Sequence, residues 1–378
     1  MSQITACIIC KNEEHHIRDC ITALKEYDIA IVVTDTGSTD RTIPIVESLL
    51  ESHDKLCHFE WCNDFSAARN FCAMQADTDW LWLVDADQIV KACDRNTLLS
   101  FIQAKSNQDR IGVITQKSRY NMQGEQTYVN SKEAHIYNRN YYHYEGSIHE
   151  QLVAGGTAEY LSDFHTRTNY AGYLLKDSLS SGTYQNLPVL MDHLGYETPE
   201  LLAQKCNRNI ALLKEAYDKE TDPYLAYQLG NAYFALGNHE MAVKYFQEGL
   251  TFDLDPKLHY VQRMVESYGY SLLALKQYDV ALTFEGIYDA FSKTADFVFL
   301  MGLIYMNNAR FEQAIAEFEK ATTFKTCGVE GTNSYRALYN KGVILECTNR
   351  ISQAKECYQK CTDFQPAQDR LRALAGGN

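Results

Sequence analysis

The sequence lacks any hydrophobic run long enough to cross a bilayer, because no stretch approaches the roughly 18 apolar residues that a transmembrane helix needs. Its first residues, Met1–Lys11, are apolar but include neither the basic segment nor the cleavage site of a signal peptide. Basic residues are also in deficit, with 35 lysines and arginines against 49 acidic residues and a formal charge of −14. We therefore expect a soluble, cytoplasmic protein with no membrane span, and we exclude a general nucleic-acid binder.

Proline and linker-type sequence are scarce as well. Six prolines and no Gly/Ser tract are present, so no flexible linker is expected. The twelve cysteines are scattered, and Cys57 and Cys62 do not have the spacing of a zinc ribbon, which favours reduced thiols over a structural zinc. No Gly-x-Gly-x-x-Gly follows the first apolar run, which argues against a Rossmann dehydrogenase.

The chain does have size and hydrophobic content: its 378 residues, 46% of them hydrophobic, indicate two or three domains. Short apolar runs at Ile4–Cys10, Ile29–Thr34 and Trp80–Val84 are typical of buried strands. Between the first two, Asn12–Leu24 has helical spacing. This alternation predicts a mostly parallel sheet with helices on both faces. Farther along, Asp177–Asn186 is expected to be an irregular loop.

The second half shows an internal repeat. Four segments align on a glycine that is followed twelve residues later by an alanine: Gly230 and Ala242, Gly269 and Ala281, Gly302 and Ala314, Gly342 and Ala354. An aromatic residue lies four positions past the alanine in three segments, whereas Glu285 takes that place in the second. The glycine separations of 33 to 40 residues bracket the period of about 34 residues of tetratricopeptide repeats. Small residues let paired helices approach, so we predict such an array, the alternative being an amphipathic helical bundle.

Paired carboxylates are the first chemical signal. Three Asp-x-Asp triplets occur, and Asp85 and Asp87 directly follow the buried run at Trp80–Val84. Open α/β sheets bind ligands at the carboxyl ends of their strands, and two buried carboxylates need a cation there. Asp77–Asp79 precedes the strand and Asp253–Asp255 falls in a repeat loop. We therefore predict that Asp85 and Asp87 form a site for a metal ion and a diphosphate, the alternative being a strand-end turn.

Asp35 is the second signal, because it follows the second apolar run and precedes a Gly-Ser turn that leads toward a helix. A carboxylate at that strand end is able to accept the N3–H of uracil, and a helix N-terminus favours phosphate. For Ser38, Thr39 and Asp40, helix capping is an equally good interpretation.

The order of these blocks carries a family resemblance. Lys11–Glu14, Asp35–Asp40 and Asp85–Asp87, with Asn63–Asn70 between the last two, resemble the inverting family 2 glycosyltransferases of GT-A fold. The resemblance implies that Asp85 belongs to the nucleotide-sugar site.

The same resemblance implies two further contacts with the nucleotide sugar. It implies that Arg69 contacts the phosphates or the ribose and that Glu13 lies near the base. For Arg69 the alternative is an ion pair on the surface of a helix.

Later blocks extend the resemblance to one branch of the family. Tyr144–Leu152, His193–Tyr196 and the Asn/Arg-rich segment Lys205–Ile210, followed by the repeats, are similar to the branch that joins a family 2 catalytic domain to tetratricopeptide repeats. This branch includes the peptide S-glycosyltransferases of glycosylated bacteriocins. The resemblance covers nearly the whole chain.

Two histidines and a glutamate complete the candidate site. A GT-A metal often needs a third protein ligand, and a neutral imidazole suits Mn²⁺, so we expect His193, in preference to His149, to join Asp85 and Asp87 in holding Mn²⁺ or Mg²⁺. Glu150, beside His149 in an otherwise apolar strand, is the candidate general base. A thiol acceptor would need less help, because thiols ionise more readily than alcohols.

The sequence thus predicts an α/β domain of GT-A type, Rossmann-like with a mostly parallel sheet, at residues 1–197. A connecting helix at 198–222 and an all-α tetratricopeptide-like domain at 223–378 are expected to follow. The expected function is inverting, metal-dependent transfer of a hexose from a UDP-sugar, UDP-glucose by preference, to a peptide or protein side chain.

The resemblance points to S-glycosylation of a cysteine in a bacteriocin precursor. The alternatives are a glycan or lipid-linked acceptor and a non-catalytic repeat scaffold. We also expect a homodimer through the repeats, because repeat arrays present extended binding faces.

Overall fold

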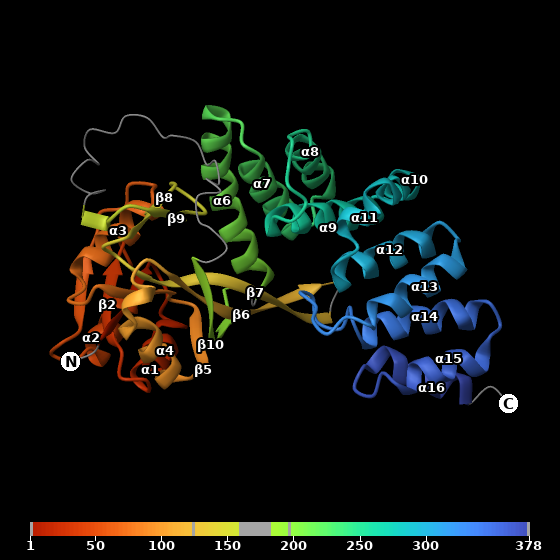
Figure 1. The fold of residues 1–378 in the computed structure, drawn as a ribbon, viewed down its shortest axis with the longest axis horizontal. Coiled ribbons are helices and arrows are strands. Elements are labelled where there is room, and N and C mark those ends of the chain that lie inside the picture. Colours follow the sequence, from red (N-terminus) through yellow and green to blue (C-terminus); the bar gives the residue numbers. More distant parts are fainter. Residues whose placement is uncertain (1–2, 123–124, 159–182, 196–197, 376–378) are drawn as a thin grey trace. The chain divides into compact units, whose positions relative to one another are not determined.

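The computed structural model describes residues 3–122, 125–158, 183–195 and 198–375. The chain divides into two compact units (Figure 1): the first contains Met1–Gln126 and Ser131–Asp222, and the second contains Thr127–Asn130 and Pro223–Asn378. None of the helices in these described ranges combines the length and hydropathy that crossing a membrane requires.

The first unit contains an eight-stranded sheet, a two-stranded sheet and helices. Its strands are β1 (Ile4–Cys10), β2 (Ala30–Asp35), β3 (Lys55–His58), β4 (Trp80–Asp85), β5 (Gln88–Cys93), β6 (Ile111–Met122), β7 (Glu125–Asn138), β8 (Tyr142–Glu145), β9 (Gln151–Ala154) and β10 (Tyr184–His193). Its helices are α1 (Ile17–Lys25), α2 (Thr42–Leu49), α3 (Phe65–Gln75), α4 (Arg95–Gln103), the short 3₁₀ helix η1 (Lys105–Asn107) and α6 (Pro199–Lys219).

The large sheet has the strand order β3-β2-β1-β4-β7-β6-β10-β5. β1 pairs in parallel with β2 and β4, β2 with β3, and β6 with β10, while β4–β7 and β5–β10 are antiparallel. The predicted mostly parallel α/β class is confirmed. The expectation of an irregular loop at 177–186 is wrong for 184–186, which begin β10, and 177–182 lie outside the described residues.

Helices cover both faces of this sheet (Figure 1). Side chains of successive strand residues point to opposite faces, so one strand contributes to two cores. Ile4, Ala6 and Ile8 of β1 pack in one core with residues of α1, α2 and α4. Cys7 of β1 packs in a second core with Cys72 of α3. Burial on both faces explains why the central strands read as continuous apolar runs.

The second unit is helical. Its elements are α7 (Pro223–Ala235), α8 (His239–Gly249), α9 (His259–Ala274), α10 (Tyr278–Ala281), η2 (Leu282–Ile287), α11 (Tyr288–Phe291), α12 (Ala295–Asn307), α13 (Phe311–Ala321), α14 (Tyr335–Cys347), α15 (Ile351–Gln359) and α16 (Gln365–Ala375). The pairs α7–α8, α12–α13 and α14–α15 pack against each other (Figure 1). The predicted helical-repeat fold is confirmed.

The repeated glycines are the contact points within these pairs. A Cβ built on Gly230 would lie 2.3 Å from the ring of Phe246, and one on Gly302 would lie 2.6 Å from the ring of Phe318. Gly342 meets Tyr358 in the same way, at 2.5 Å. Each first helix therefore needs a residue without a side chain where the aromatic ring of its second helix packs.

The second repeat departs from this pattern where the sequence has Glu285 in place of the aromatic residue. Its second helix is divided into α10, η2 and α11. Phe284, one residue earlier, supplies the ring, which would lie 2.9 Å from a Cβ on Gly269. A 3₁₀ segment winds more tightly than an α-helix, which brings the earlier residue to the packing position.

Candidate active site

The candidate site lies at the carboxyl ends of the parallel strands. Asp85 is the last residue of β4, and Asp35 is the last residue of β2; β1 lies between these two strands. β10 runs parallel to β6 and ends at His193, whose register partner on β5 is Gln88. Because Asp87 directly precedes Gln88, this pairing brings Asp87 beside His193.

Asp87 is a buried carboxylate of the site, with a side chain 6% exposed. Its Oδ1 lies 3.5 Å from Nε2 of His193, and its Oδ2 accepts from the ammonium of Lys205 on α6. Burial alone would raise the pKa of Asp87, but the hydrogen bonds and charges of His193 and Lys205 outweigh it and hold the pKa well below its usual range. Asp87 is therefore an anion at neutral pH.

His193 is oriented by a polar network on β6. Its Nδ1 lies 3.3 Å from Oγ of Ser118 and 3.4 Å from Nε2 of Gln116. Gln116 in turn accepts from Nε2 of Gln88 at 2.6 Å. This network leaves Nε2 of His193 directed at Asp87. Burial disfavours the charged imidazole, but the hydrogen bond and charge of Asp87 outweigh it and raise the pKa of His193.

The donor chemistry around Asp87 fits a divalent ion that is completed by a ligand. Among the described residues, no group of three or more His, Cys, Asp or Glu side chains is arranged to hold a metal by itself. Asp87 Oδ1 and His193 Nε2 do face each other at 3.5 Å, as two donor atoms that one divalent ion could share. Mg²⁺ is commonly held by one or two protein groups, with substrate phosphates and water completing the shell.

Asp85, the third member of the predicted ligand set, pairs with an arginine. Nη2 of Arg69 donates to Oδ1 of Asp85 at 3.0 Å, and Nε of Arg69 donates to Glu150. Burial would raise the pKa of Asp85, but the charge of Arg69 outweighs it and lowers that pKa. Arg69 thus forms ion pairs with both Asp85 and Glu150.

Arg69 also has an unused donor. Its side chain is 10% exposed, and its Nη1 is buried without a hydrogen-bond partner among the described residues. A buried guanidinium with an unsatisfied N–H is costly unless a ligand completes it. The planar guanidinium is suited to binding phosphate oxygens in pairs. The phosphate contact expected of Arg69 stays a prediction.

Glu150 pairs with Arg69, and His149 directly precedes Glu150 in the chain. Glu150 is 9% exposed, and its carboxylate is held by Arg69. His149 has a left-handed backbone, with φ of 51°, which is uncommon for a residue with a side chain and often marks a functional site. Burial, and then the charge of Arg208, lower the pKa of His149 to about 4, so its imidazole is neutral at pH 7.

The loops after β1 and β2 interlock around Asp35. Its carboxylate accepts from the backbone N–H of Gly37 at 3.0 Å and of Ser38 at 3.1 Å, and it is 3.6 Å from Nδ1 of His58. In the β1 loop, the N–H of Glu13 donates to Thr42 at 2.8 Å. Asp35 thus shapes the Gly-Ser turn as a capping residue would, while Glu13 lies in the loop joined to the start of α2.

Sequence reasoning missed Lys205 and the glutamine–serine network behind His193. Lys205 falls in a segment that the family resemblance singled out, but no role was expected for it. The available signal was the spacing of Lys205 and Arg208, which puts two cations on one face of a helix.

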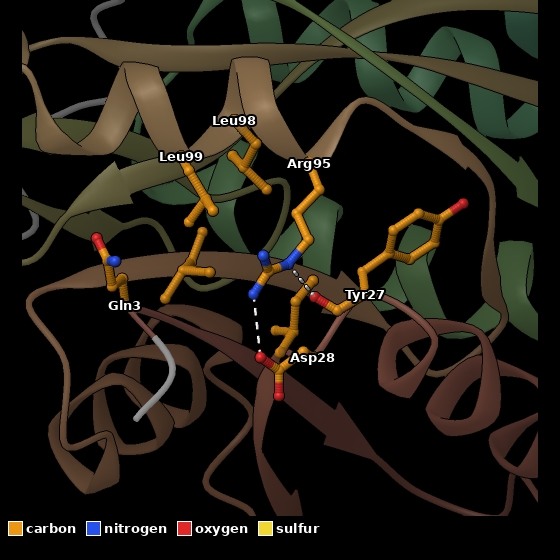
Figure 2. Close-up of a pocket in the computed structure, with 8 residues that line it drawn as sticks. Gln3, Tyr27, Asp28, Arg95, Leu98 and Leu99 are labelled. Atoms are coloured by element: carbon orange, nitrogen blue, oxygen red, sulfur yellow. Dashed lines mark hydrogen bonds and ion pairs between the residues drawn. The ribbon is translucent and has the colours of Figure 1, made fainter.

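A small pocket elsewhere in the first unit is unrelated to these residues. Figure 2 shows Gln3, at the start of β1, and Tyr27 and Asp28, before β2, lining it with Arg95 and Leu98 of α4. Arg95 donates to Asp28 at 3.0 Å and to the Tyr27 carbonyl. These residues lie at the amino ends of the strands, opposite the carboxyl-end site.

Family models match segments of both units of the chain. The family model "Glycosyl transferase family 2" matches residues 5–158, and tetratricopeptide repeat models match residues 223–255, 295–325 and 335–368. The three repeat segments contain Gly230, Gly302 and Gly342.

Several curated proteins are similar to parts of the chain. The SPbeta prophage-derived glycosyltransferase SunS of Bacillus subtilis (strain 168) is 24% identical over 253 residues, which are 65% of this chain and 53% of the relative. The lipopolysaccharide core biosynthesis glycosyltransferase LpsC of Rhizobium meliloti (strain 1021) is 30% identical over 102 residues, 27% of this chain and 37% of the relative. A TPR repeat-containing protein of Synechococcus elongatus is 39% identical over 88 residues, 23% of this chain and 21% of the relative. The chain thus spans about half or less of the length of these curated relatives.

Among solved structures, S. aureus TarS is similar over 73% of this chain and 53% of TarS, with 15% identity and a TM-score of 0.34. MamA from Desulfovibrio magneticus RS-1 is similar over 45% of this chain and 94% of MamA, with 26% identity and a TM-score of 0.36. On the family matches, the chain carries a family 2 glycosyltransferase domain followed by tetratricopeptide repeats.

Proposed function

We propose that the first domain transfers a hexose with inversion from a UDP-sugar, UDP-glucose by preference, to a side chain of a peptide or protein. The observation that carries this proposal is the pair formed by Asp87 and His193, set beside the Arg69–Asp85 ion pair at the carboxyl edge of a family 2 domain. This arrangement puts two candidate metal ligands and an arginine, which could neutralise the leaving diphosphate, at the same edge of the sheet.

We assign the donor-binding roles as follows. Asp35 accepts from the uracil ring, Glu13 lies near the base, and Arg69 contacts the diphosphate through its buried, unsatisfied Nη1. In support, Asp35 is 3% exposed at the end of β2, and Arg69 already lies against Asp85. Asp85 shares the donor site with Arg69.

We propose that Asp87 and His193 hold Mn²⁺ or Mg²⁺, with Asp85 beside them. Such an ion, when bound, neutralises charge on the leaving diphosphate. The role of the chain itself is to hold Asp87 ionised and to aim Nε2 of His193, through Ser118 and Gln116. The metal requirement is thus proposed from the donor set and the family.

We propose Glu150 as the general base for the acceptor. Its carboxylate is bound to Arg69, a contact that a diphosphate would compete for. Engagement of Arg69 by the donor would then leave Glu150 available to accept the acceptor's proton. His149 is the alternative: its imidazole is neutral at pH 7, but a base with a pKa of about 4 is weak there.

We propose a peptide or protein acceptor, including a cysteine of a bacteriocin precursor, because the SunS alignment covers 65% of the chain and because repeat arrays bind extended partners. A glycan acceptor is the second candidate, favoured by the similarity to a lipopolysaccharide core glycosyltransferase. Mass analysis of a cysteine- or serine-containing peptide and of an extracted glycan, each incubated with protein and UDP-glucose, would separate the two candidates.

We further propose that the repeat unit forms a homodimer. Light scattering at micromolar concentration should give twice the monomer mass of 43.2 kDa, and a monomer mass would contradict the proposal.

A thermal melt with UDP, with and without Mn²⁺, tests the donor site. A ligand that binds only the native state at a hundredfold excess over its Kd stabilises by about 2.7 kcal/mol. We expect a rise in Tm that needs both UDP and Mn²⁺ and that is lost in Asp87→Ala. Asp79→Ala is the matched control, because Asp79 belongs to the triplet before β4 and is 60% exposed. A rise retained in Asp87→Ala would contradict the proposed site, and no rise with any nucleotide would favour a non-catalytic scaffold.

A further inference from the structure

Helix α6 brings a lysine to the centre of the candidate site. The helix begins after Thr198, whose side chain accepts from the N–H of Leu201, and Pro199 occupies its first turn. One and a half turns later, the ammonium of Lys205 is bound to Oδ2 of Asp87. The two side chains are 23% and 6% exposed, so this ion pair is largely enclosed.

The backbone at Gly195 encloses the same cluster. A Cβ built on Gly195 would lie 2.3 Å from Oδ2 of Asp87, 2.7 Å from Nζ of Lys205 and 2.9 Å from Nε2 of His193. The three charged or polar groups therefore converge on one point that the glycine leaves open. An ion held by Asp87 and His193 would therefore also lie close to Nζ of Lys205.

A divalent ion and the lysine ammonium cannot both rest there without repulsion. Two cations about 4 Å apart repel strongly at the low effective dielectric of a partly buried site. Each is attracted by the same carboxylate, Asp87. Binding of a divalent ion to Asp87 and His193 therefore favours movement of the Lys205 ammonium away from that ion.

A second cation lies on the same face of this helix. Arg208, one turn after Lys205, has its guanidinium carbon 5.3 Å from the ring centroid of Phe65, the first residue of α3. Its charge also reaches His149, the neighbour of Glu150. α6 thus places two cations, Lys205 beside Asp87 and Arg208 near His149, at the candidate site.

We propose that Lys205 is an exchangeable counter-ion: it neutralises Asp87 when the donor site is empty, and it moves to the donor's diphosphate when a divalent ion takes its place. This inference rests on the proposed UDP-sugar site. It assigns to α6, the connecting helix, a direct part in donor binding. The exchange keeps Asp87 paired with a cation in both states.

Opposite effects on two ligands distinguish this role from a structural one. Without Lys205, Asp87 loses its resident cation, so a bare divalent ion should bind more tightly. The diphosphate loses a charged donor, so UDP should bind more weakly in the presence of the ion. A lysine that only stabilised the fold would not strengthen binding of either ligand.

The test compares wild type, Lys205→Met and Lys205→Gln by electron paramagnetic resonance of Mn²⁺ without nucleotide, and by calorimetry of UDP in saturating Mn²⁺. We expect the Kd for Mn²⁺ alone to fall by on the order of tenfold, because a competing cation is removed. We expect the Kd for UDP to rise by on the order of tenfold, as for loss of one charge-assisted hydrogen bond. Thermal melts of each variant establish that it is folded.

Lys25→Met is the matched control. Like Lys205, Lys25 is about one-fifth exposed (22%) and pairs with a buried aspartate, Asp54, at 3.1 Å. This variant should leave both affinities unchanged.

An unchanged or weakened Mn²⁺ affinity in both Lys205 variants would overturn the inference, whatever happens to UDP. A wild-type protein that binds no UDP would instead refute the proposed function, and the Mn²⁺ comparison would still decide whether Lys205 is the counter-ion of Asp87.

Discussion

Arg69→Met should destabilise the protein strongly, because Arg69 joins two carboxylates in the first unit. The side chains of Arg69 and Glu150 are 10% and 9% exposed, and that of Asp85 is 39% exposed. Methionine keeps an apolar stem of similar length but leaves Glu150 buried without its counter-ion. Removal of one partner of a buried ion pair costs about 3–5 kcal/mol. We expect the free energy of unfolding at pH 7 to fall by that amount.

Arg95→Met is the control for this measurement. Figure 2 shows Arg95 paired with Asp28. The pair is 3.0 Å apart, but these side chains are 44% and 82% exposed. Exposed pairs contribute about 0–1 kcal/mol. Urea unfolding followed by tryptophan fluorescence compares the variants, since Trp80 and Trp82 are buried in this unit. A loss in Arg69→Met no larger than that in Arg95→Met would refute the reasoning.

The pH dependence gives a second check on Arg69. Burial opposes ionisation of Asp85, but the charge of Arg69 outweighs it, so the pKa of Asp85 is lower in the folded protein. A lowered pKa adds stability that is present above the unfolded value of about 3.9 and is lost as the pH falls through the folded value. The stability gap between wild type and Arg69→Met should therefore narrow below about pH 4. A constant gap would contradict the ion-pair account.

Three further predictions concern the site wall and the repeats. Gly195→Ala places a Cβ 2.3 Å from a carboxylate oxygen of the site, so calorimetry should show the affinity for UDP with Mn²⁺ reduced at least about tenfold. Gly286→Ala is the control, because its Cβ would meet no atom within 4 Å, and it should leave that affinity unchanged. Phe246→Ala should lower the unfolding free energy in urea by about 3–5 kcal/mol, but Phe252→Ala, 37% exposed, by much less. Burial, with the Arg263 charge opposing it, raises the pKa of Glu266 to about 7. Because that folded value exceeds the unfolded one, the stability of the wild type falls as the pH rises toward 7. The Tm of Glu266→Gln should therefore rise relative to that of the wild type between pH 5 and pH 8. A Tm difference between the two proteins that is the same at both pH values would contradict this.

The sequence predicted secondary structure correctly where the local hydrophobic pattern and the tertiary environment agree. β1 spans the predicted Ile4–Cys10, because a strand buried on both faces is a continuous apolar run. The helix expected from Asn12 begins at Ile17 instead. Asn12 has φ of 58°, and its side chain accepts from the N–H of Thr39 at 2.8 Å. That contact joins two loops and has no local signature in the sequence.

The repeat array shows the same limit. Glycine and aromatic positions predicted the helix pairs, since one contact recurs in each. At Glu285 the pattern failed, and the sequence alone did not show that Phe284 would supply the ring through a 3₁₀ segment. A shift of one residue depends on packing against Gly269 of the preceding helix, which local propensity does not encode.

For the candidate site, the sequence indicated the carboxylates at strand ends but not their partners. Asp85 and Asp87 were identifiable because they follow a buried strand. The partners lie far away in sequence: Glu150 is 81 residues from Arg69, and Lys205 is 118 residues from Asp87. Which cation meets which carboxylate is decided by strand order and by the course of α6. The electrostatics of the site therefore required the structure.

The most direct test of the account is the position of a bound Mn²⁺. Crystals grown with Mn²⁺ and UDP should show an anomalous peak within bonding distance of both Oδ1 of Asp87 and Nε2 of His193, with the diphosphate against Arg69. A peak elsewhere, or bound UDP with no ion between these two side chains, would contradict the assignment of this edge of the sheet as the metal and donor site.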